Sequence, residues 1–179
     1  VSLLPKTLDY MVSRGMKNEK FVYIPNGINI EEWENSKSDL PEEYKNILEK
    51  LKNDGYFLVC YAGSHGIGDK LQYLIDSSKY INNLKIKIIL VGQGPEKENL
   101  IKYVKENNLQ NVLFLSAIPK NSIPSLLKYM DCLYIGWQKI PLYRFGISAN
   151  KLFDYMMSGK PVIHAVEAAN DPVKEANCG

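Results

Sequence analysis

The chain has 179 residues, of which 45% are hydrophobic and 23% are charged, the balance of a folded globular protein rather than of a disordered one. Its formal net charge is only +2, so bulk electrostatics give no reason to propose nucleic-acid binding. The longest apolar runs fall far short of the roughly 18 residues that a membrane span requires.

Three cysteines, Cys60, Cys132 and Cys178, show no C-x-x-C spacing. The first two lie inside apolar runs, where a free cysteine behaves as a small hydrophobic residue. Inert thiols of this kind favour a cytoplasmic location over an oxidising compartment.

From residue 21 onward, short apolar runs alternate with helical patterns. The patterns predict strands at 21–24, 56–62, 87–91, 111–115, 132–135 and 160–164, and helices at 41–51, 69–81, from 95 onward, 122–129, 148–158 and 171–177. The longer strands are almost continuously apolar, as in a parallel sheet covered on both faces. Strand–helix alternation of this kind predicts a doubly wound, Rossmann-like α/β fold.

Both ends of the chain differ from this pattern. Within residues 1–20, Leu4, Leu8 and Met11 form one helical stripe before Gly15, which predicts a helix that packs on a part of the protein outside this chain. The sequence begins without Met and stops at Gly179, inside or just after a helix. We therefore expect a piece of a longer protein.

In an open parallel sheet, ligands bind beyond the carboxyl ends of the strands. The loop 63–70 follows the first long strand and contains three glycines, which allow backbone amides to approach a phosphate. It is not a P-loop, because Asp69-Lys70 stands where that motif has Lys-Ser/Thr. A mobile glycine loop with no ligand is the alternative.

The loop at Gly92-Gln93-Gly94 resembles the start of a dinucleotide fingerprint, but Lys97 stands where the third glycine belongs. A plain strand-to-helix turn explains this loop equally well. We keep Gly94 as a candidate ligand contact.

The stretch 144–155 carries the most chemical information. Ser148 is a good helix N-cap, and Lys151 in the first helical turn is unfavourable beside the positive end of the helix dipole unless an anion binds there. Asn150 and Asp154 share a helix face with this lysine. An amide, an ammonium and a carboxylate placed in this way suit a nucleoside diphosphate, although an ordinary surface Lys–Asp pair is the alternative.

Other residue types point to little chemistry. His65 and His164 are the only histidines and have no partners at metal-ligand spacing, so no metal site is expected. A G-x-S-x-G nucleophile elbow is also missing. Trp137 and Tyr143 precede the 144–155 stretch and could line a sugar pocket, or they could be partly buried aromatics.

Several motifs occur in a fixed order along the chain. They are Ile24-Pro25-Asn26-Gly27-Ile28, the loop that begins at Gly63, Val91-Gly92-Gln93-Gly94-Pro95, Gly146 to Met156, and Gly159-Lys160-Pro161-Val162. This ordered set resembles the C-terminal, donor-binding domain of family 4 glycosyltransferases with the GT-B fold, and most closely the bacterial branch that builds capsule or O-antigen units.

The resemblance implies a retaining transfer of a sugar from a nucleotide diphosphate sugar, often linked to UDP, without a metal or other cofactor. Residues 1–20 would then be a hinge between domains, and 21–179 the donor domain. The acceptor, a glycan or lipid-linked sugar, would bind an N-terminal domain absent from this chain. The implied location is cytoplasmic, and contact with the inner face of the plasma membrane is left open.

The resemblance also assigns roles to individual residues. The diphosphate would lie against Gly63, Ser64, Ser148, Ala149, Asn150 and Lys151. Asp154 would bind the ribose and Ile118 the base, while Lys70, Gly94 and Tyr143 would be further donor contacts.

Two departures from the family pattern keep an alternative open. The first glutamate of the family's pair falls on Gly146, and its usual Arg and Lys fall on Ser64 and Asp69. A nucleotide-binding α/β module without catalytic activity is therefore the second hypothesis. We expect this chain alone, without the acceptor domain, to bind nucleotide weakly and to transfer nothing.

Overall fold

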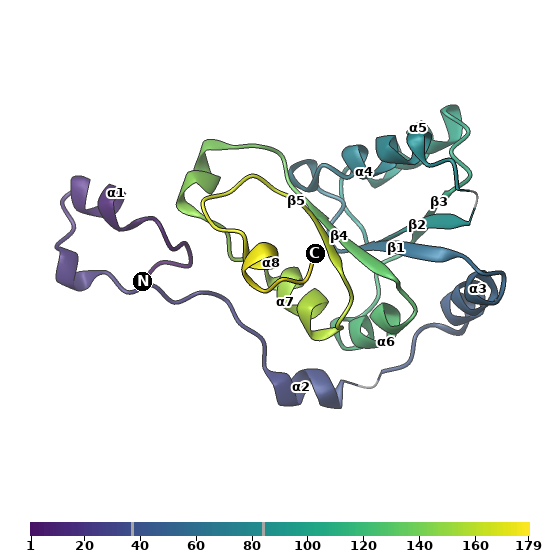
Figure 1. Cartoon of the computed structure of the whole chain (residues 1–179), viewed down its shortest axis with the longest axis horizontal. Helices are drawn as coiled ribbons and strands as arrows, with labels where there is room; N and C mark the ends of the chain where they lie inside the picture. Colours follow the sequence, from purple (N-terminus) through teal and green to yellow (C-terminus); the bar gives the residue numbers. More distant parts are fainter. Residues whose placement is uncertain (37, 84) are drawn as a thin grey trace.

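A computed structural model describes residues 1–36, 38–83 and 85–179. Its centre is a parallel sheet with strand order β3-β2-β1-β4-β5 (Figure 1). The strands are β1 (Phe57–Ala62), β2 (Ile86–Val91), β3 (Val112–Leu115), β4 (Cys132–Gly136) and β5 (Val162–Ala165). The doubly wound α/β fold expected from the sequence is confirmed.

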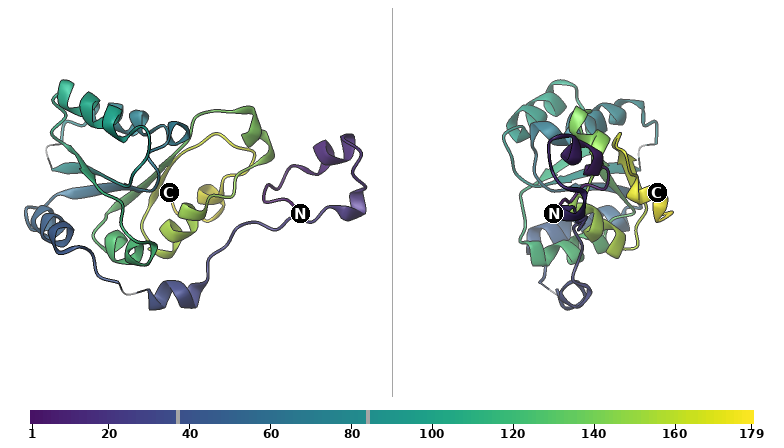
Figure 2. Two further views of the ribbon diagram at one scale, coloured as in Figure 1. Left: turned by 180° about the vertical axis from the view of Figure 1, so that it is seen from behind. Right: turned by 90° about the vertical axis from the view of Figure 1, so that its left-hand side faces the viewer.

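Helices cover both faces of the sheet, as Figure 2 shows from behind and from the side. On one face, α4 (Leu71–Ser77) and α5 (Lys97–Glu106) enclose a core with one set of strand residues. On the other, α3 (Glu42–Asn53), α6 (Ile123–Lys128), α7 (Asn150–Met157) and α8 (Pro172–Glu175) enclose a second core.

Successive residues of one strand belong to the two cores on opposite faces of the sheet. In β1, Leu58 and Cys60 belong to the core with α3 and α6, whereas Val59 and Tyr61 belong to the core with α4 and α5. Because a strand places alternate side chains on opposite faces, a strand buried on both faces must be apolar throughout. This explains the unbroken apolar run between residues 56 and 62.

Some predicted boundaries are wrong. Residues 21–24 form no strand of the sheet, and Tyr23 makes only an isolated parallel bridge with Ser2. The predicted helix at 69–81 is α4 followed by a 3-10 helix at Ser78–Tyr80. The expected helix at 148–158 begins later, at Asn150, with Ala149 in the N-cap position.

The N-terminal segment lies beyond the end of the sheet (Figure 1). It contains α1 (Leu8–Ser13) and a 3-10 helix (Asn18–Lys20), so Leu4 lies outside the helix expected there. A further helix, α2 (Ile30–Asn35), lies on the path back to α3. Among the described residues, no helix is both long and apolar enough to span a bilayer.

Candidate functional site

Two adjoining cavities open at the carboxyl ends of the strands, with volumes of about 340 and 810 Å³. The smaller lies over the ends of β1 and β2, and the larger extends toward residues 27–36. Five residues line both: Ala62, Gly63, Lys120, Lys151 and Asp154. Lys151 and Asp154, one turn apart on α7, therefore face one continuous space, as expected from their spacing.

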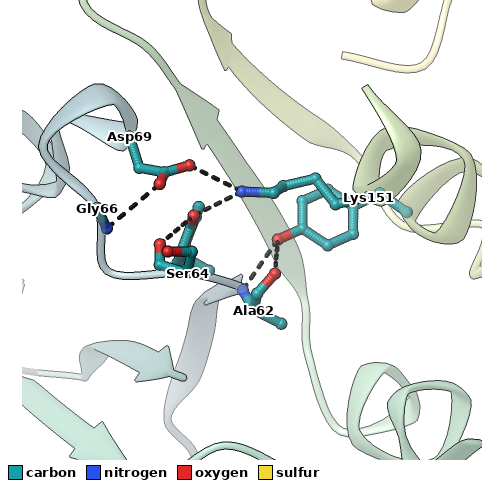
Figure 3. A network of polar contacts seen from close by, with 7 residues as sticks. Ala62, Ser64, Gly66, Asp69 and Lys151 are labelled. Carbon is teal, nitrogen blue, oxygen red and sulfur yellow. Dashed lines mark hydrogen bonds and ion pairs between the residues drawn. The ribbon is translucent and has the colours of Figure 1, made fainter. Parts of the chain in front are cut away.

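The ammonium group of Lys151 is held by two oxygens. Its Nζ lies 2.9 Å from Oδ1 of Asp69 and 2.5 Å from the hydroxyl of Tyr61, and 4.4 Å from the centre of the tyrosine ring. Asp69 also accepts a hydrogen bond from the backbone N–H of Gly66 (Figure 3). The ion pair is mostly buried, with 22% of the lysine side chain and 14% of the aspartate exposed.

Tyr61 holds the ammonium group of Lys151 in place. Its side chain is fully buried, and burial together with the carboxylate of Asp69 raises the pKa of its hydroxyl. The protonated hydroxyl donates to the carbonyl of Ser64 (2.7 Å) while it accepts from Lys151. Tyr61 thus fixes the glycine loop after β1 and the position of the ammonium group together.

Asp154 is a half-buried carboxylate that lines both cavities. Burial raises the pKa of its carboxyl, and the nearby ammonium group of Lys120 partly offsets that rise. The next residue, Tyr155, is buried and accepts a hydrogen bond from the N–H of Ala62 (2.9 Å), which ties α7 to the end of β1. A carboxylate held in this way can accept hydrogen bonds from two hydroxyl groups.

Two asparagines each form a pair of hydrogen bonds with the segment that leads into α7. Asn26 donates its backbone N–H to the hydroxyl of Ser148 (2.8 Å) and its side-chain amide to the carbonyl of the same residue (2.6 Å). The side chain of Asn170 accepts from the N–H of Ile147 (2.7 Å) and donates to its carbonyl (3.2 Å). The predicted N-cap role of Ser148 is therefore wrong, because its hydroxyl serves the Asn26 contact.

The remaining candidate residues at the start of α7 lie in different surroundings. Asn150 is exposed and lines the larger cavity, whereas Ala149 is 7% exposed and belongs to the core. Gly146 has a φ of +102°, a left-handed conformation that favours glycine, and an added Cβ would lie 2.5 Å from Pro5. Gly146 is the position of the first glutamate in the family's pair. In this chain both the backbone conformation and the contact with Pro5 require a glycine there.

The glycine loops after β1 and β2 pack directly against each other. A Cβ on Gly92 would lie 1.8 Å from the carbonyl oxygen of Gly63, and one on Gly94 would lie 2.5 to 2.7 Å from backbone atoms of His65. Gly63 and Ser64 line the smaller cavity, but Gly94 lines neither of the two. The second loop therefore has a packing reason for its glycines, and a donor contact for Gly94 stays a prediction.

Beneath these loops lies a buried polar pair that the sequence did not reveal. The Nζ of Lys97 donates to the carbonyls of Gly92 (2.8 Å) and Leu115 (3.0 Å) and joins the ends of β2 and β3. His65 beside it is fully buried, and neither ring nitrogen has a partner among the described residues. Burial and then the ammonium group of Lys97 lower the pKa of His65 to about 4, so the imidazole is neutral at pH 7.

Three other predicted residues lie in different places. Ile118 lines the smaller cavity beside Lys151 and Asp154. Lys70 lines neither cavity and adopts a left-handed conformation at the start of α4. Tyr143 stacks on Trp137, with ring centroids 5.3 Å apart, and lines a separate cavity of about 620 Å³ at the ends of β4 and β5.

Several cavity residues escaped the sequence analysis. They belong to α2 with its N-cap and to the 3-10 helix after β3, short elements that the sequence analysis did not predict: Asn29, Glu32, Lys120 and Asn121. The motif Ile24-Pro25-Asn26-Gly27-Ile28, part of the ordered set that carries the family resemblance, was the sign in the sequence that the neighbourhood of α2 belongs to the site.

The architecture is that of a doubly wound α/β domain with cavities at the carboxyl edge of the sheet, where open parallel sheets bind ligands. The family model of the glycosyl transferases group 1 matches residues 42–177. The chain belongs to this family. No curated protein sequence matches the chain.

Solved structures share the fold at low sequence identity. Anabaena Alr3699/HepE in complex with UDP-glucose is 19% identical with a TM-score of 0.69, and the match covers 93% of this chain and 44% of that one. WaaG, a glycosyltransferase involved in lipopolysaccharide biosynthesis, is 19% identical with a TM-score of 0.68, covering 99% and 47%. A glycosyltransferase from Rickettsia africae is 15% identical with a TM-score of 0.69, covering 98% and 45%.

These structures place the chain among GT-B glycosyltransferase folds, and it spans less than half of the length of each of the three.

Proposed function

We propose that the chain is the donor-binding domain of a retaining glycosyltransferase that uses a UDP-linked sugar in the synthesis of a cell-surface polysaccharide. The observation that carries the proposal is the continuous cavity lined by Gly63, Lys151 and Asp154 at the carboxyl edge of the sheet. Two structural neighbours support it, since HepE was solved with UDP-glucose and WaaG is involved in lipopolysaccharide biosynthesis.

In this proposal the diphosphate lies at the start of α7 and the ribose hydroxyls bind Asp154. Lys151 and the first backbone N–H groups of the helix supply positive charge, which is favourable for an anion at a helix N-terminus. The same groups would stabilise the negative charge that grows on the leaving phosphate during transfer. The hydrophobic side of Ile118 supports the base.

Capsule or O-antigen synthesis, a lipid-linked acceptor bound by an N-terminal domain, metal independence and cytoplasmic action at the membrane surface belong to the same proposal. They concern the whole enzyme. Their test is transfer by the full-length protein in the presence of a chelator, with the anomeric configuration of the product read by NMR. A product with inverted configuration would refute the retaining mechanism.

Binding to the chain itself is tested by titration calorimetry with UDP, GDP, NAD and pyrophosphate. We expect UDP to bind best, and Asp154→Asn to weaken UDP about fivefold while leaving pyrophosphate unchanged, because only UDP carries the ribose. A chain that prefers NAD would favour the second hypothesis, a nucleotide-binding module without catalytic activity. An equal loss for both ligands would refute the ribose role of Asp154.

A further inference from the structure

The charge balance of the cavity leaves its best-placed cation already neutralised. Lys151 pairs with Asp69 at 2.9 Å, so an incoming phosphate at that ammonium group also meets a carboxylate within a few ångströms. Two more carboxylates line the larger cavity, those of Asp154 and Glu32. Like charges at such distances repel strongly where water is partly excluded. Lys151 alone is therefore a poor receptor for a diphosphate.

Lys120 is the second cation of the same space. Among the described residues that line the two cavities, it and Lys151 are the only lysines or arginines, and Lys120 contributes to both cavities. It follows β3 and opens a short 3-10 helix (Lys120–Ser122), so it reaches the cavity from a different element than α7. Within the described residues it forms no ion pair, and it is exposed.

The position of Lys120 is also set by its surroundings. Ser122, two residues on, is buried and donates its hydroxyl to the carbonyl of Asp39, and Asn121 lines the larger cavity. The backbone under the lysine is therefore anchored, whereas the side chain has no ion-pair partner among the described residues to give up when an anion arrives. A free lysine at an anchored site binds a phosphate as a point charge.

We propose that Lys120 binds the diphosphate of the sugar nucleotide. Its positive charge takes the place of that of Lys151, which Asp69 neutralises. This rests on the proposed function, since it adds a second ligand-binding cation to the same cavity. Lys120 and Asp154 line the same two cavities without forming an ion pair. With the donor in place, Asp154 binds the ribose hydroxyls and the ammonium group of Lys120 binds the phosphates. Base and ribose recognition do not depend on it.

The test compares Lys120→Gln with Lys128→Gln, a matched control at the exposed end of α6 that lines neither cavity. Both variants lose one positive charge of the protein, so only local effects differ. Calorimetry with UDP at low and high salt should give about tenfold weaker binding for Lys120→Gln, with a smaller dependence on salt than the parent protein. Binding of uridine, followed by ligand-detected NMR, should be unchanged in both variants.

Two outcomes would overturn the role of Lys120 alone: UDP affinity of Lys120→Gln within twofold of the parent, or a loss of uridine affinity as large as the loss for UDP. The second would mean that the lysine acts through Asp154 and the ribose. If the parent protein bound neither UDP, GDP nor pyrophosphate, the proposed function itself would fail, and this inference with it.

Discussion

Two lysines at the same edge of the sheet show how partners decide what a charged side chain does. Lys97 is 7% exposed and donates to two backbone carbonyls, those of Gly92 and Leu115. Lys151 is more exposed and binds a hydroxyl and a carboxylate, Tyr61 and Asp69. The carbonyls cannot leave, because they belong to strand ends, whereas the carboxylate can be replaced by another anion. The first lysine is therefore structural, and the second can bind an anion only in competition with Asp69.

The largest expected effect follows from removing the structural lysine. Lys97→Met keeps much of the side-chain volume but removes this donor from the buried carbonyl of Gly92 and leaves that of Leu115 with the N–H of Gly92 alone, and an unsatisfied buried acceptor costs about 1–3 kcal/mol. We expect the free energy of unfolding in urea to fall by about 3 kcal/mol.

Lys105→Met is the control, because this lysine lies in the last turn of the same helix and is exposed. An equal, small loss in both variants would contradict the structural role of Lys97.

The next effect concerns the neutral histidine beside Lys97. In the folded protein the pKa of His65 is about 4, below its ordinary value of 6.5. Between these values the unfolded chain takes up a proton on the imidazole and the folded chain does not. The contribution of His65 to stability is therefore complete above pH 6.5 and is lost as the pH falls toward 4. The loss is at most about 3 kcal/mol.

Carboxylates also titrate in this range, so the measurement is the difference between two unfolding curves over about pH 7 to 4, for the parent and for His65→Leu. The variant should lose less stability on acidification. Parallel curves would show that the imidazole is protonated in the folded state as easily as in the unfolded one.

The fold could be predicted further than the site. The apolar runs of β1, β2 and β4, interrupted only by Lys87 in β2, follow directly from burial on both faces, and each run is bounded by turn residues. A strand was also predicted at 21–24, where the composition is equally β-rich, and that prediction is wrong. Val22, Tyr23 and Ile24 are exposed, and the segment lies outside the sheet. Composition reports what a segment could form, not whether a neighbouring strand is present.

The site depends on contacts between residues far apart in the chain, which periodicity cannot reveal. Lys151 and Asp154 were found because one helical turn relates them. The bond from Asn26 to Ser148 and the ion pair from Asp69 to Lys151 join positions more than 80 residues apart. In the sequence, Lys97 is noticeable only because it stands where a dinucleotide fingerprint has its third glycine. Its burial and its two hydrogen bonds to strand ends are visible only in the structure.

The third prediction concerns Lys151, which the proposed function places at the diphosphate. Lys151→Ala removes one of the two lysines that line the cavity within the described part of the chain, and we expect about tenfold weaker UDP binding by calorimetry, a loss of about 1.4 kcal/mol. Because half of its ion pair is lost as well, the thermal midpoint of the variant is measured in parallel. Lys102→Ala, a site with 75% of its side chain exposed, is the control. Unchanged UDP affinity would remove Lys151 from the site.

The smallest effect has the opposite sign. Asp69→Asn removes the carboxylate that neutralises Lys151 and keeps one oxygen, which can accept from the ammonium group of Lys151 in place of Oδ1 while the contact of Oδ2 with the N–H of Gly66 is lost. The cavity then becomes more positive, so UDP should bind about threefold more tightly, and the gain should shrink as salt is added. Asp54→Asn makes the same change of charge at an exposed position outside both cavities. Weaker UDP binding by Asp69→Asn alone would mean that the carboxylate orients Lys151 for the ligand rather than competing with it.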